Sequence, residues 1–313
     1  MNKGVIFISG GAGFIGSHLT DILLKRGYRV RVFDNLSTGK RSNLPLENPL
    51  VQLIEGNIAD PVAVAQAMNG CTAVVHLAAV ASVQASVDDP INTHQSNFVG
   101  TLNVCEAMRQ LKISRILFAS SAAVYGGNGE GQAIGEDTPK SPLTPYASDK
   151  LASEYYIDFY RRQHAFESAI FRFFNIFGPR QDPASPYSGV ISIFADRVQK
   201  NLPITVFGDG EQTRDFVYVE DLVQILVQAL EAPMVDSCPI NIGMNHSTTL
   251  NQLIAALCEI TKFSPAVVYA PARTGDIRHS LANNKKLATH YKVENKTSLK
   301  SGLEKLLAHS TEH

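Results

Sequence analysis

Three side chains that can transfer protons lie close together in the middle of the sequence. Ser121 lies in the stretch ASSAAVYG (119–126), and Tyr146 and Lys150 lie in PYASDK (145–150). A tyrosine has an ordinary pKa near ~10, so it is a poor base at neutral pH unless a cation stabilises its phenolate. On a helix, a lysine four residues further along lies on the same face as the phenol. The spacing therefore predicts a proton-transferring group in which Lys150 assists Tyr146 and Ser121 contributes a hydroxyl.

A glycine-rich segment near the N-terminus has the form of a nucleotide-binding loop. The stretch ISGGAGFIGSHL places Gly10, Gly13 and Gly16 after a predicted strand and at the start of a predicted helix. Glycines allow a tight turn and a close approach of the backbone to a pyrophosphate, and the helix N-terminus presents free N–H groups to that anion. We expect this loop, together with Phe14 and Ile15, to bind a dinucleotide.

Asp34 ends the second predicted strand and bears on which dinucleotide binds. A carboxylate at this place accepts both hydroxyls of an adenine ribose and repels a 2′-phosphate, which favours NAD over NADP. Lys40 and Arg41 follow soon after and weigh in the other direction. We predict NAD as the cofactor.

The elements that must position these residues alternate between strands and helices. Short β-branched runs predict buried strands over 4–9, 29–33, 51–56, 73–79 and 115–121, with a sixth over 168–174. Helical patterns separate them over 14–26, 61–68 and 91–111, and another helix follows Tyr146. This alternation predicts an α/β domain with a doubly wound parallel sheet of the Rossmann type.

After about residue 175 the sequence changes to short extended pieces separated by proline and glycine. The stretches PITVFG, DFVYVEDL, CPINIG and AVVYAP read as extended, and LNQLIAALCEITKF reads as an amphipathic helix. We expect an NAD-binding domain over 1–174 and a smaller α/β substrate domain over 175–313, some segments of which can return to the first domain.

Composition sets limits on the class of protein. A hydrophobic content of 44%, a charged content of 18% and a net charge of -1 are typical of a globular protein without a nucleic-acid-binding surface. The four cysteines are scattered, so neither a metal site nor a disulfide framework is predicted. No apolar run approaches the roughly 20 residues of a membrane span, and the first strand leaves no room for a signal peptide. We expect a cytoplasmic protein.

The order GGAGFIG, DN, HLAA, SSAAVYG and YASDK resembles that of the extended short-chain dehydrogenase/reductase family over essentially the whole chain. The resemblance implies that Ser121, Tyr146 and Lys150 are catalytic. It further implies contacts to NAD from the glycine loop, Tyr146, Lys150 and the residues that follow the strands: Asp34, Asn35, Asn57, Ile58, Leu77, Ala78 and Ala79. Asn57 stands where many relatives have Asp.

The second half resembles the nucleotide-sugar segments of UDP-hexose 4-epimerases within that family. The segments are RFFNIFGPRQDP, PITVFGDGEQTRDFVYVEDL and RTGDIRHSLAN. The resemblance implies that Asn175 and the Val190 backbone contact the diphosphate and that Phe207 lies against the uracil. Arg214 and Arg273 would hold the diphosphate, and Asp276 the uridine ribose. In the loop at 82–85 the contact with substrate is expected from Ser82, since Gln84 and Ala85 differ from the Pro-Arg of relatives.

Two positions narrow the expected reaction. Sugar dehydratases and UDP-glucuronate decarboxylases of the family tend to carry an acid just after the catalytic serine, whereas this chain has Ala122 and Ala123. The resemblance thus favours C4 epimerisation through a 4-keto sugar. Ser280 stands where epimerases limited to plain hexoses tend to carry Tyr, which leaves room for a 2-acetamido group.

The leading expectation is therefore interconversion of UDP-GlcNAc and UDP-GalNAc, as in the epimerases of bacterial polysaccharide synthesis such as that of the Pel exopolysaccharide. A UDP-glucose/UDP-galactose 4-epimerase, a dual-specificity enzyme and a non-catalytic NAD-binding regulatory protein remain as alternatives. The resemblance also implies a homodimer, in which the long helix before Ser121 and the Tyr146 helix form a four-helix interface.

Overall fold

The computed structural model describes residues 3–129, 131–182, 189–272, 277–293 and 296–310. Arg273 and Asp276, for which we expect contacts with the diphosphate and the ribose, lie outside the described residues. The chain divides into two compact units. The first unit comprises Met1–Val124, Pro142–Arg172 and Val223–Ile240, and the second comprises Tyr125–Ser141, Phe173–Leu222 and Asn241–His313.

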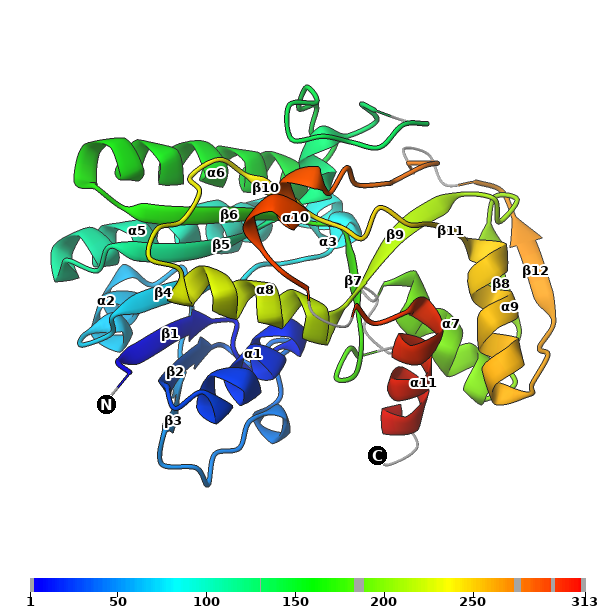
Figure 1. Cartoon of the computed structure of the whole chain (residues 1–313), viewed down its shortest axis with the longest axis horizontal. Coiled ribbons are helices and arrows are strands. Elements are labelled where there is room, and N and C mark those ends of the chain that lie inside the picture. Colours follow the sequence, from blue (N-terminus) through cyan, green and yellow to red (C-terminus); the bar gives the residue numbers. More distant parts are fainter. Residues whose placement is uncertain (1–2, 130, 183–188, 273–276, 294–295, 311–313) are drawn as a thin grey trace. The chain divides into compact units, whose positions relative to one another are not determined.

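A seven-stranded sheet lies mainly in the first unit (Figure 1), and of its strand β10 only Ile240 belongs to that unit. Its order is β10-β6-β5-β4-β1-β2-β3, and β1, β2, β3, β4 and β5 pair in parallel. The strands are β1 (Val5–Ser9), β2 (Arg29–Asp34), β3 (Val51–Glu55), β4 (Ala73–His76), β5 (Arg115–Ser121), β6 (Glu167–Phe173) and β10 (Ile240–Ile242). The order reverses between β1 and β4, and open parallel sheets bind ligands beyond the carboxyl ends of strands at such a point.

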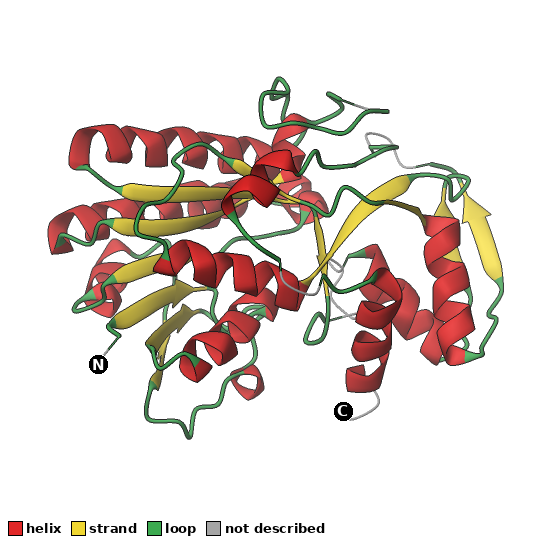
Figure 2. Cartoon of the chain, viewed as in Figure 1, coloured by secondary structure: helices red, strands yellow, loops and turns green. Residues whose placement is uncertain are grey.

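Helices cover both faces of this sheet (Figures 1 and 2), which confirms the predicted doubly wound α/β fold. The helices α2, α5 and α6 pack against one another on one face, and α1 lies on the other. The helical elements are α1 (Phe14–Lys25), η1 (Arg41–Asn43), α2 (Pro61–Met68), α3 (Val83–Asp88), α4 (Pro90–His94), η2 (Gln95–Val99), α5 (Gly100–Leu111), η3 (Ala122–Tyr125) and α6 (Pro145–His164).

A hydrophobic core of the first unit lies between the sheet and the layer formed by α2, α5 and α6. Phe7 and Phe33 from the strands meet Val104 and Met108 from α5 and Ile157 from α6, and all five are buried. Burying large apolar side chains contributes about 1.5–3 kcal/mol each relative to leaving them exposed. This packing fixes the helix that carries Tyr146 and Lys150 against the strand that carries Ser121.

The structure corrects three of the predicted elements. The strand expected over 73–79 ends at His76, so Leu77, Ala78 and Ala79 lie in the loop beyond it. The helix expected over 91–111 is continuous in the chain but contains a π-helical segment, Gln95–Val99. The stretch DFVYVEDL is extended only as far as Tyr218, because α8 (Val219–Glu231) begins there with Glu220 and Asp221 in its first turn.

The second unit contains two small sheets. The order of the first is β11-β9-β7, in which β7 runs parallel and β11 antiparallel to β9, and the second pairs β12 with β8 in parallel. Helices α7, α9 and α11 pack together beside them. The elements are β7 (Asn175–Phe177), α7 (Val190–Gln199), β8 (Ile204–Phe207), β9 (Thr213–Tyr218), β11 (Ser247–Thr249), α9 (Leu250–Thr261), β12 (Val267–Ala270), α10 (Lys285–His290) and α11 (Leu299–Ser310).

The chain crosses between the two units near the predicted boundary at 174 and also elsewhere. One crossing falls between Arg172 and Phe173. Residues 125–141 belong to the second unit although they come before the predicted boundary in the sequence. Residues 223–240, which include most of α8, belong to the first unit. The division into an NAD-binding domain over 1–174 and a substrate domain over 175–313 stays a prediction.

No helix among the described residues has the length and apolar character needed to cross a membrane.

Candidate active site

The glycine loop joins β1 to α1 in the conformation that a bound phosphate needs. Gly10 has a positive φ of 70°, and a Cβ there would come within 2.8 Å of the Ala78 nitrogen. A Cβ on Gly16 would come within 2.4 Å of the Gly10 carbonyl oxygen. Gly13 caps α1 without any side-chain hydrogen bond, so the first N–H groups of the helix are not satisfied by a cap. The loop thus has the close backbone approach and the free donors that fit a dinucleotide.

Asp34 lies beside this loop at the carboxyl end of β2. Its carboxylate accepts hydrogen bonds from the Ala12 N–H at 3.0 Å and the Leu36 N–H at 2.9 Å. Burial raises the pKa of Asp34, and these backbone donors lower it again. The carboxylate retains further lone pairs, because each oxygen accepts only one of these two bonds. It can therefore also accept ribose hydroxyls, in keeping with the prediction of NAD.

The other residues expected to touch NAD gather at the same edge of the sheet. Phe14 and Ile15 form the first turn of α1, and Asn35 follows β2 directly. Beyond β3 lie Asn57 and Ile58, and beyond β4 lie Leu77, Ala78 and Ala79. Parallel strands end on one edge, so the fold brings these segments together. Ile58 is 7% exposed and packs in the core, so its side chain serves mainly packing. Its carbonyl oxygen accepts a hydrogen bond from the Asn103 side chain at 3.0 Å.

Ser121, Tyr146 and Lys150 also come together in the first unit. Thr144 caps α6, with its side chain accepting a hydrogen bond from the Ala147 N–H, and Pro145 occupies the first turn. The Lys150 Nζ donates to the Ala119 carbonyl oxygen on β5 at 2.7 Å and lies 6.0 Å from the centre of the Tyr146 ring. A hydrogen bond joins Ser121 to Tyr146. The predicted group of three therefore exists as a structural unit.

Burial controls the charges of this group. It lowers the pKa of Lys150 to about 8, against the opposing effect of the negative Asp149 and Glu154. Burial also raises the pKa of Tyr146, and the hydrogen bond from Ser121 lowers it. The phenolate loses hydration at this site, and this loss opposes the stabilisation that we expect from Lys150.

Sequence reasoning missed His76, a buried residue beneath the site. Its Nδ1 lies 2.6 Å from the Ser9 hydroxyl, which also accepts from the Ala78 N–H, and its Nε2 lies 3.0 Å from the Thr101 hydroxyl. Burial, aided by the positive Lys150, lowers the pKa of His76 to about 3. The ring is therefore neutral and ties the end of β4 to the residue before the glycine loop. A histidine in the otherwise apolar run AVVHLAA was the signal available in the sequence.

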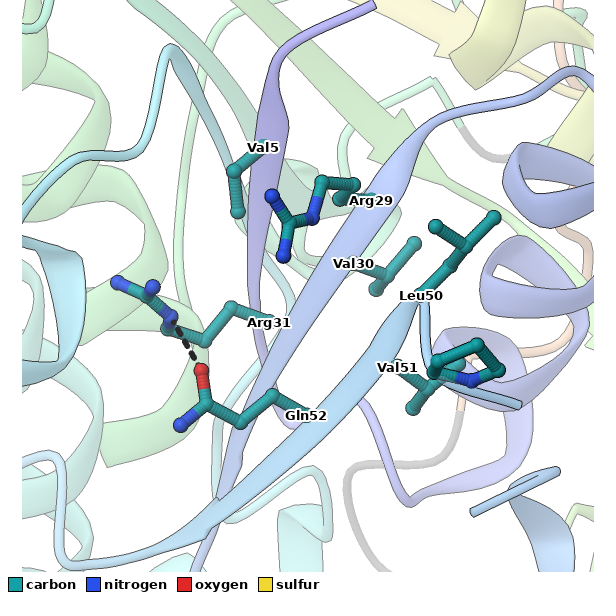
Figure 3. A pocket seen from close by; sticks show the side chains of 8 residues that line it. Val5, Arg29, Val30, Arg31, Leu50, Val51 and Gln52 are labelled. Carbon is teal, nitrogen blue, oxygen red and sulfur yellow. Dashed lines mark hydrogen bonds between the residues drawn. The ribbon is translucent and has the colours of Figure 1, made fainter. Parts of the chain in front are cut away.

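The first unit also contains a small cavity that does not belong to this site. It measures about 120 Å³ (Figure 3), and its walls include Val5, Arg29 and Val51, which begin β1, β2 and β3. Arg31 donates to Gln52 across it at 3.0 Å. It therefore lies at the amino ends of the strands, the opposite edge from the glycine loop.

The residues of the second unit expected to bind the substrate are arranged around β9. Asn175, on β7, pairs with Phe216 of β9, and its side chain donates to the Asp215 carbonyl oxygen at 3.4 Å. Arg214 lies on β9 itself. The Ser280 N–H donates to the Thr213 carbonyl oxygen at 3.2 Å. Strand β9 thus brings Asn175, Arg214 and Ser280 together from distant parts of the sequence.

Three further predicted contacts lie elsewhere. Phe207 ends β8, and its carbonyl oxygen accepts a hydrogen bond from Gln212 at 2.6 Å. Val190 is the first residue of α7, after Gly189, which caps the helix without a side chain. In the first unit, Ser82 caps α3 by accepting from the Ala85 N–H at 3.0 Å and is 6% exposed. The structure thus gives the Ser82 side chain a capping role, and it does not test the expected contact with substrate.

Comparisons with known proteins agree with this geometry. Residues 6–243 match the NAD dependent epimerase/dehydratase family, and the chain belongs to that family. NAD is accordingly its cofactor.

The chain is similar over nearly its full length to three proteins of solved structure. A UDP-glucose 4-epimerase from Thermotoga maritima, solved with UDP-glucose, is 36% identical with a TM-score of 0.93, over 98% of this chain and 99% of that one. A UDP-N-acetylglucosamine 4-epimerase from Methanobrevibacter ruminantium, in complex with UDP-N-acetylmuramic acid, is 32% identical with a TM-score of 0.94, over 100% and 99%. A UDP-glucose 4-epimerase from Thermus thermophilus, in complex with NAD, is 37% identical with a TM-score of 0.90, over 97% and 98%.

The loop geometry predicts that Gly16→Ala weakens NAD binding. The added Cβ would clash with the Gly10 carbonyl oxygen at 2.4 Å and force the loop open. Calorimetric titration with NAD measures the effect, and a loss of at least about tenfold in affinity is expected, because a loss of ~1.4 kcal/mol already weakens binding tenfold. Gly135→Ala is the control, since a Cβ there meets nothing within 4 Å. Equal affinities in the two variants would contradict the assignment of the loop.

The burial of His76 predicts a loss of stability in acid. The pKa of His76 is about 3 in the folded protein and 6.5 in the unfolded chain. Below pH 6.5 only the unfolded state binds a proton at this ring, so the free energy of unfolding decreases as the pH is lowered. Each pH unit below 6.5 lowers the free energy of unfolding by about 1.4 kcal/mol, so the loss amounts to about 2 kcal/mol at pH 5. Urea unfolding at pH 7 and pH 5 measures it.

In His76→Asn this contribution should disappear, while His246→Asn, at an exposed position, serves as the control. An unchanged difference between the two pH values in His76→Asn would show that another group is responsible.

Proposed function

We propose that this protein is an NAD-dependent UDP-sugar 4-epimerase whose main substrate pair is UDP-GlcNAc and UDP-GalNAc. The observation that carries the proposal is the group formed by Ser121, Tyr146 and Lys150 at the sheet edge that also holds the glycine loop and Asp34. A base, a cation and a hydroxyl beside an NAD site suit the removal of a proton from a sugar hydroxyl.

In the proposed mechanism Tyr146 removes the proton from the sugar 4-hydroxyl. Ser121, hydrogen-bonded to Tyr146, orients that hydroxyl and relays the proton. Lys150, held by the Ala119 carbonyl oxygen, directs its positive charge toward the phenol. Bound NAD supplies the hydride acceptor and donor for C4, and its nicotinamide ring adds a positive charge that favours the phenolate. The 4-keto sugar would rotate within the site and present its other face, and Tyr146 would then return the proton to the oxygen at C4.

The residues after Ser121 favour epimerisation over elimination or decarboxylation. Ala122 and Ala123 begin a short helical turn, and the Ala123 N–H donates to the Ser121 hydroxyl at 3.2 Å. An elimination of water needs an acid as well as a base, and these two positions offer neither carboxylate nor other proton donor in a side chain. Proton transfer at the 4-hydroxyl needs only Ser121, Tyr146 and Lys150.

The second domain, 175–313, would bind the nucleotide sugar. We assign the diphosphate to Asn175, the Val190 backbone, Arg214 and Arg273, because guanidinium groups form paired hydrogen bonds with phosphate oxygens. Phe207 would lie against the uracil and Asp276 would accept the ribose hydroxyls. In the first domain, 1–174, Ser82 would contact the sugar.

The choice of sugar rests on Ser280. Its backbone is tied to Thr213 on β9, so a small side chain at this position leaves space that a Tyr would fill. The similar proteins include a UDP-N-acetylglucosamine 4-epimerase as well as UDP-glucose 4-epimerases, which makes a UDP-glucose/UDP-galactose 4-epimerase the second candidate. A product UDP-GalNAc would serve as a sugar donor for polysaccharide synthesis.

We also propose a homodimer formed through α5 and α6. Tyr155, Tyr156 and Phe159 on α6 are 64%, 45% and 49% exposed, which is unusual for three large aromatic side chains within five residues. A second copy packing against this face would bury them in a four-helix interface.

Tyr146→Phe should lower kcat at least about 10³-fold for every sugar turned over, since the variant has no phenol to accept the proton. Nuclear magnetic resonance of the C4 configuration, with UDP-GlcNAc and UDP-glucose side by side, measures both activity and preference. A Phe variant at full rate would refute the role of Tyr146. A parent protein that binds NAD but inverts neither sugar would favour a non-catalytic role.

Ser280→Tyr should reduce kcat/KM for UDP-GlcNAc by at least about tenfold, because the larger side chain would occupy the space of the 2-acetamido group. A misfit of this kind in a binding pocket costs ~1–3 kcal/mol. Turnover of UDP-glucose should change much less. Ser280→Ala is the matched control, since it keeps the side chain small. Equal losses for both sugars in the Tyr variant would indicate general disruption of the site and not control of the sugar.

Phe159→Glu should convert the dimer into a monomer, because a carboxylate would be buried without a partner in the interface. Light scattering of the purified protein measures the mass. Phe263→Glu, at a residue 47% exposed in the second unit, is the control and should remain dimeric. A monomeric parent protein would disprove the interface.

A further inference from the structure

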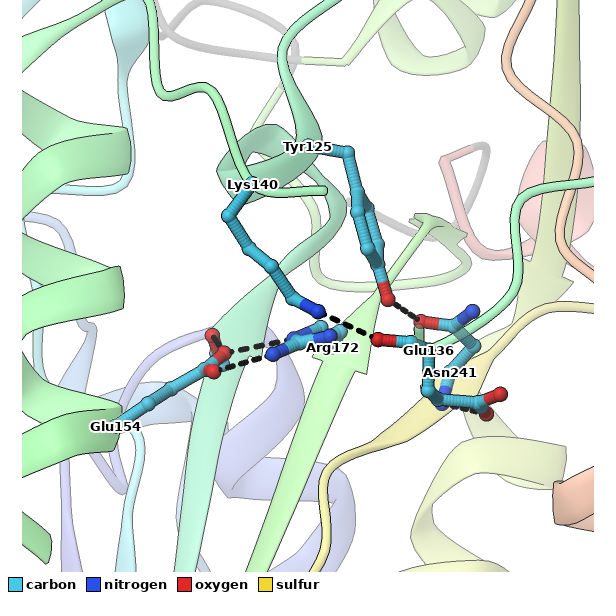
Figure 4. A network of polar contacts seen from close by, with 7 residues as sticks. Tyr125, Glu136, Lys140, Glu154, Arg172 and Asn241 are labelled. Carbon is cyan, nitrogen blue, oxygen red and sulfur yellow. Dashed lines mark hydrogen bonds and ion pairs between the residues drawn. The ribbon is translucent and has the colours of Figure 1, made fainter. Parts of the chain in front are cut away.

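A buried ion pair lies next to the candidate catalytic group but takes no part in the mechanism above. Arg172 on β6 donates to both carboxylate oxygens of Glu154 on α6, from Nε at 2.9 Å and from Nη2 at 2.6 Å. The two side chains are 3% and 5% exposed. Figure 4 shows the carboxylate of Glu154 directed at the guanidinium group. Burying two charges is costly, and a bidentate geometry offsets only part of that cost.

This pair is joined to the strand that carries the catalytic serine. The Ser120 hydroxyl donates to Oε1 of Glu154 at 2.5 Å, the oxygen that also accepts from Arg172 Nε. Ser120 immediately precedes Ser121 on β5. Glu154 also lies one helical turn beyond Lys150, just as Lys150 lies one turn beyond Tyr146. One carboxylate therefore connects the end of β5, the strand β6 and the catalytic face of α6.

We propose that Glu154, oriented by Arg172, is a positioning residue that holds Ser121 and Lys150 in their working geometry. Two short connections between α6 and β5 fix the group: Lys150 to the Ala119 carbonyl oxygen and Ser120 to Glu154. Both reach β5 at the two residues that immediately precede Ser121, so loss of one lets the helix shift along the strand. Misplacement of reacting groups by as little as ~1 Å can cost about a hundredfold in rate.

The charge of Glu154 supports the same role. Burial lowers the pKa of Lys150 to about 8, and the negative Asp149 and Glu154 on α6 raise it. His76 on β4 also faces the ammonium, whose charge helps to lower the pKa of the His76 ring and keep it neutral. Asp149 is itself bound by His94 at 2.8 Å. Removing the carboxylate of Glu154 takes away a negative charge that raises the pKa of Lys150, so it would favour loss of the proton from Lys150.

Two substitutions separate position from charge. Ser120→Ala removes only the hydrogen bond to Glu154, and we expect kcat to fall about three- to tenfold with KM unchanged, as a hydrogen bond worth ~1 kcal/mol predicts. Glu154→Gln removes the charge, and we expect the alkaline fall of kcat to move to lower pH by about one unit. Ser168→Ala is the matched control, since Ser168 is a buried serine on β6 whose hydroxyl has no hydrogen-bond partner among the described residues.

A second measurement does not require turnover. Carbon-13 titration of the Lys150 side chain in the NAD-loaded protein, assigned with Lys150→Met, should show a lower pKa in Glu154→Gln than in the parent and an unchanged one in Ser168→Ala. The inference rests on the proposed function only for its kinetic part. A parent without epimerase activity would overturn the proposed function and leave the titration to decide the role of Glu154.

The proposal is overturned if Ser120→Ala matches Ser168→Ala in kcat, or if Lys150 titrates alike in the parent and in Glu154→Gln. If Glu154→Gln fails to fold, the comparison of Ser120→Ala with Ser168→Ala decides. Equal unfolding midpoints in these two serine variants, with a lower kcat only in Ser120→Ala, would support positioning over a purely structural role.

Discussion

The buried ammonium of Lys150 is the interaction on which the candidate site depends. It is 3% exposed, donates to the Ala119 carbonyl oxygen at 2.7 Å and lies 4.8 Å from the centre of the Phe118 ring. An ammonium at such a position is costly because it has lost its hydration, and its lowered pKa of about 8 reflects that cost. The same loss of solvent strengthens its effect on any charge that develops beside it. The surroundings of Lys150 therefore have to be rigid and correctly charged.

Several features of the first unit meet this need. The α6 helix is held in the core by Ile157 and Tyr160, and the Ser120, Glu154 and Arg172 contacts tie it to β5 and β6. Asp149 and Glu154 provide negative charge near the ammonium. His76 is neutral, so it contributes hydrogen bonds to Ser9 and Thr101 without adding a second buried positive charge. Polar groups that would be costly alone become stable because each has a partner.

The second unit positions its residues by backbone hydrogen bonds. Asp215 on β9 is 0% exposed and accepts from the N–H groups of Met244, Asn245 and Ala282. Ser280 is held to Thr213 in the same way. A loop fixed by its main chain can change its side chains without losing its place, so one scaffold can present different residues to different sugars. This property fits a family whose similar members carry the names of epimerases for both plain and acetylated sugars.

Local pattern and spacing in the sequence were enough to determine the parallel α/β fold, the glycine loop, NAD as the cofactor and the association of Ser121, Tyr146 and Lys150. Each depends on neighbours a few residues apart or on the rule that parallel strands end at one edge. The tertiary structure alone decided that Glu154 pairs with Arg172, that His76 is neutral and that burial raises the pKa of Tyr146. Desolvation and the pairing of charges depend on which distant segments pack around a side chain, and no local pattern records that packing.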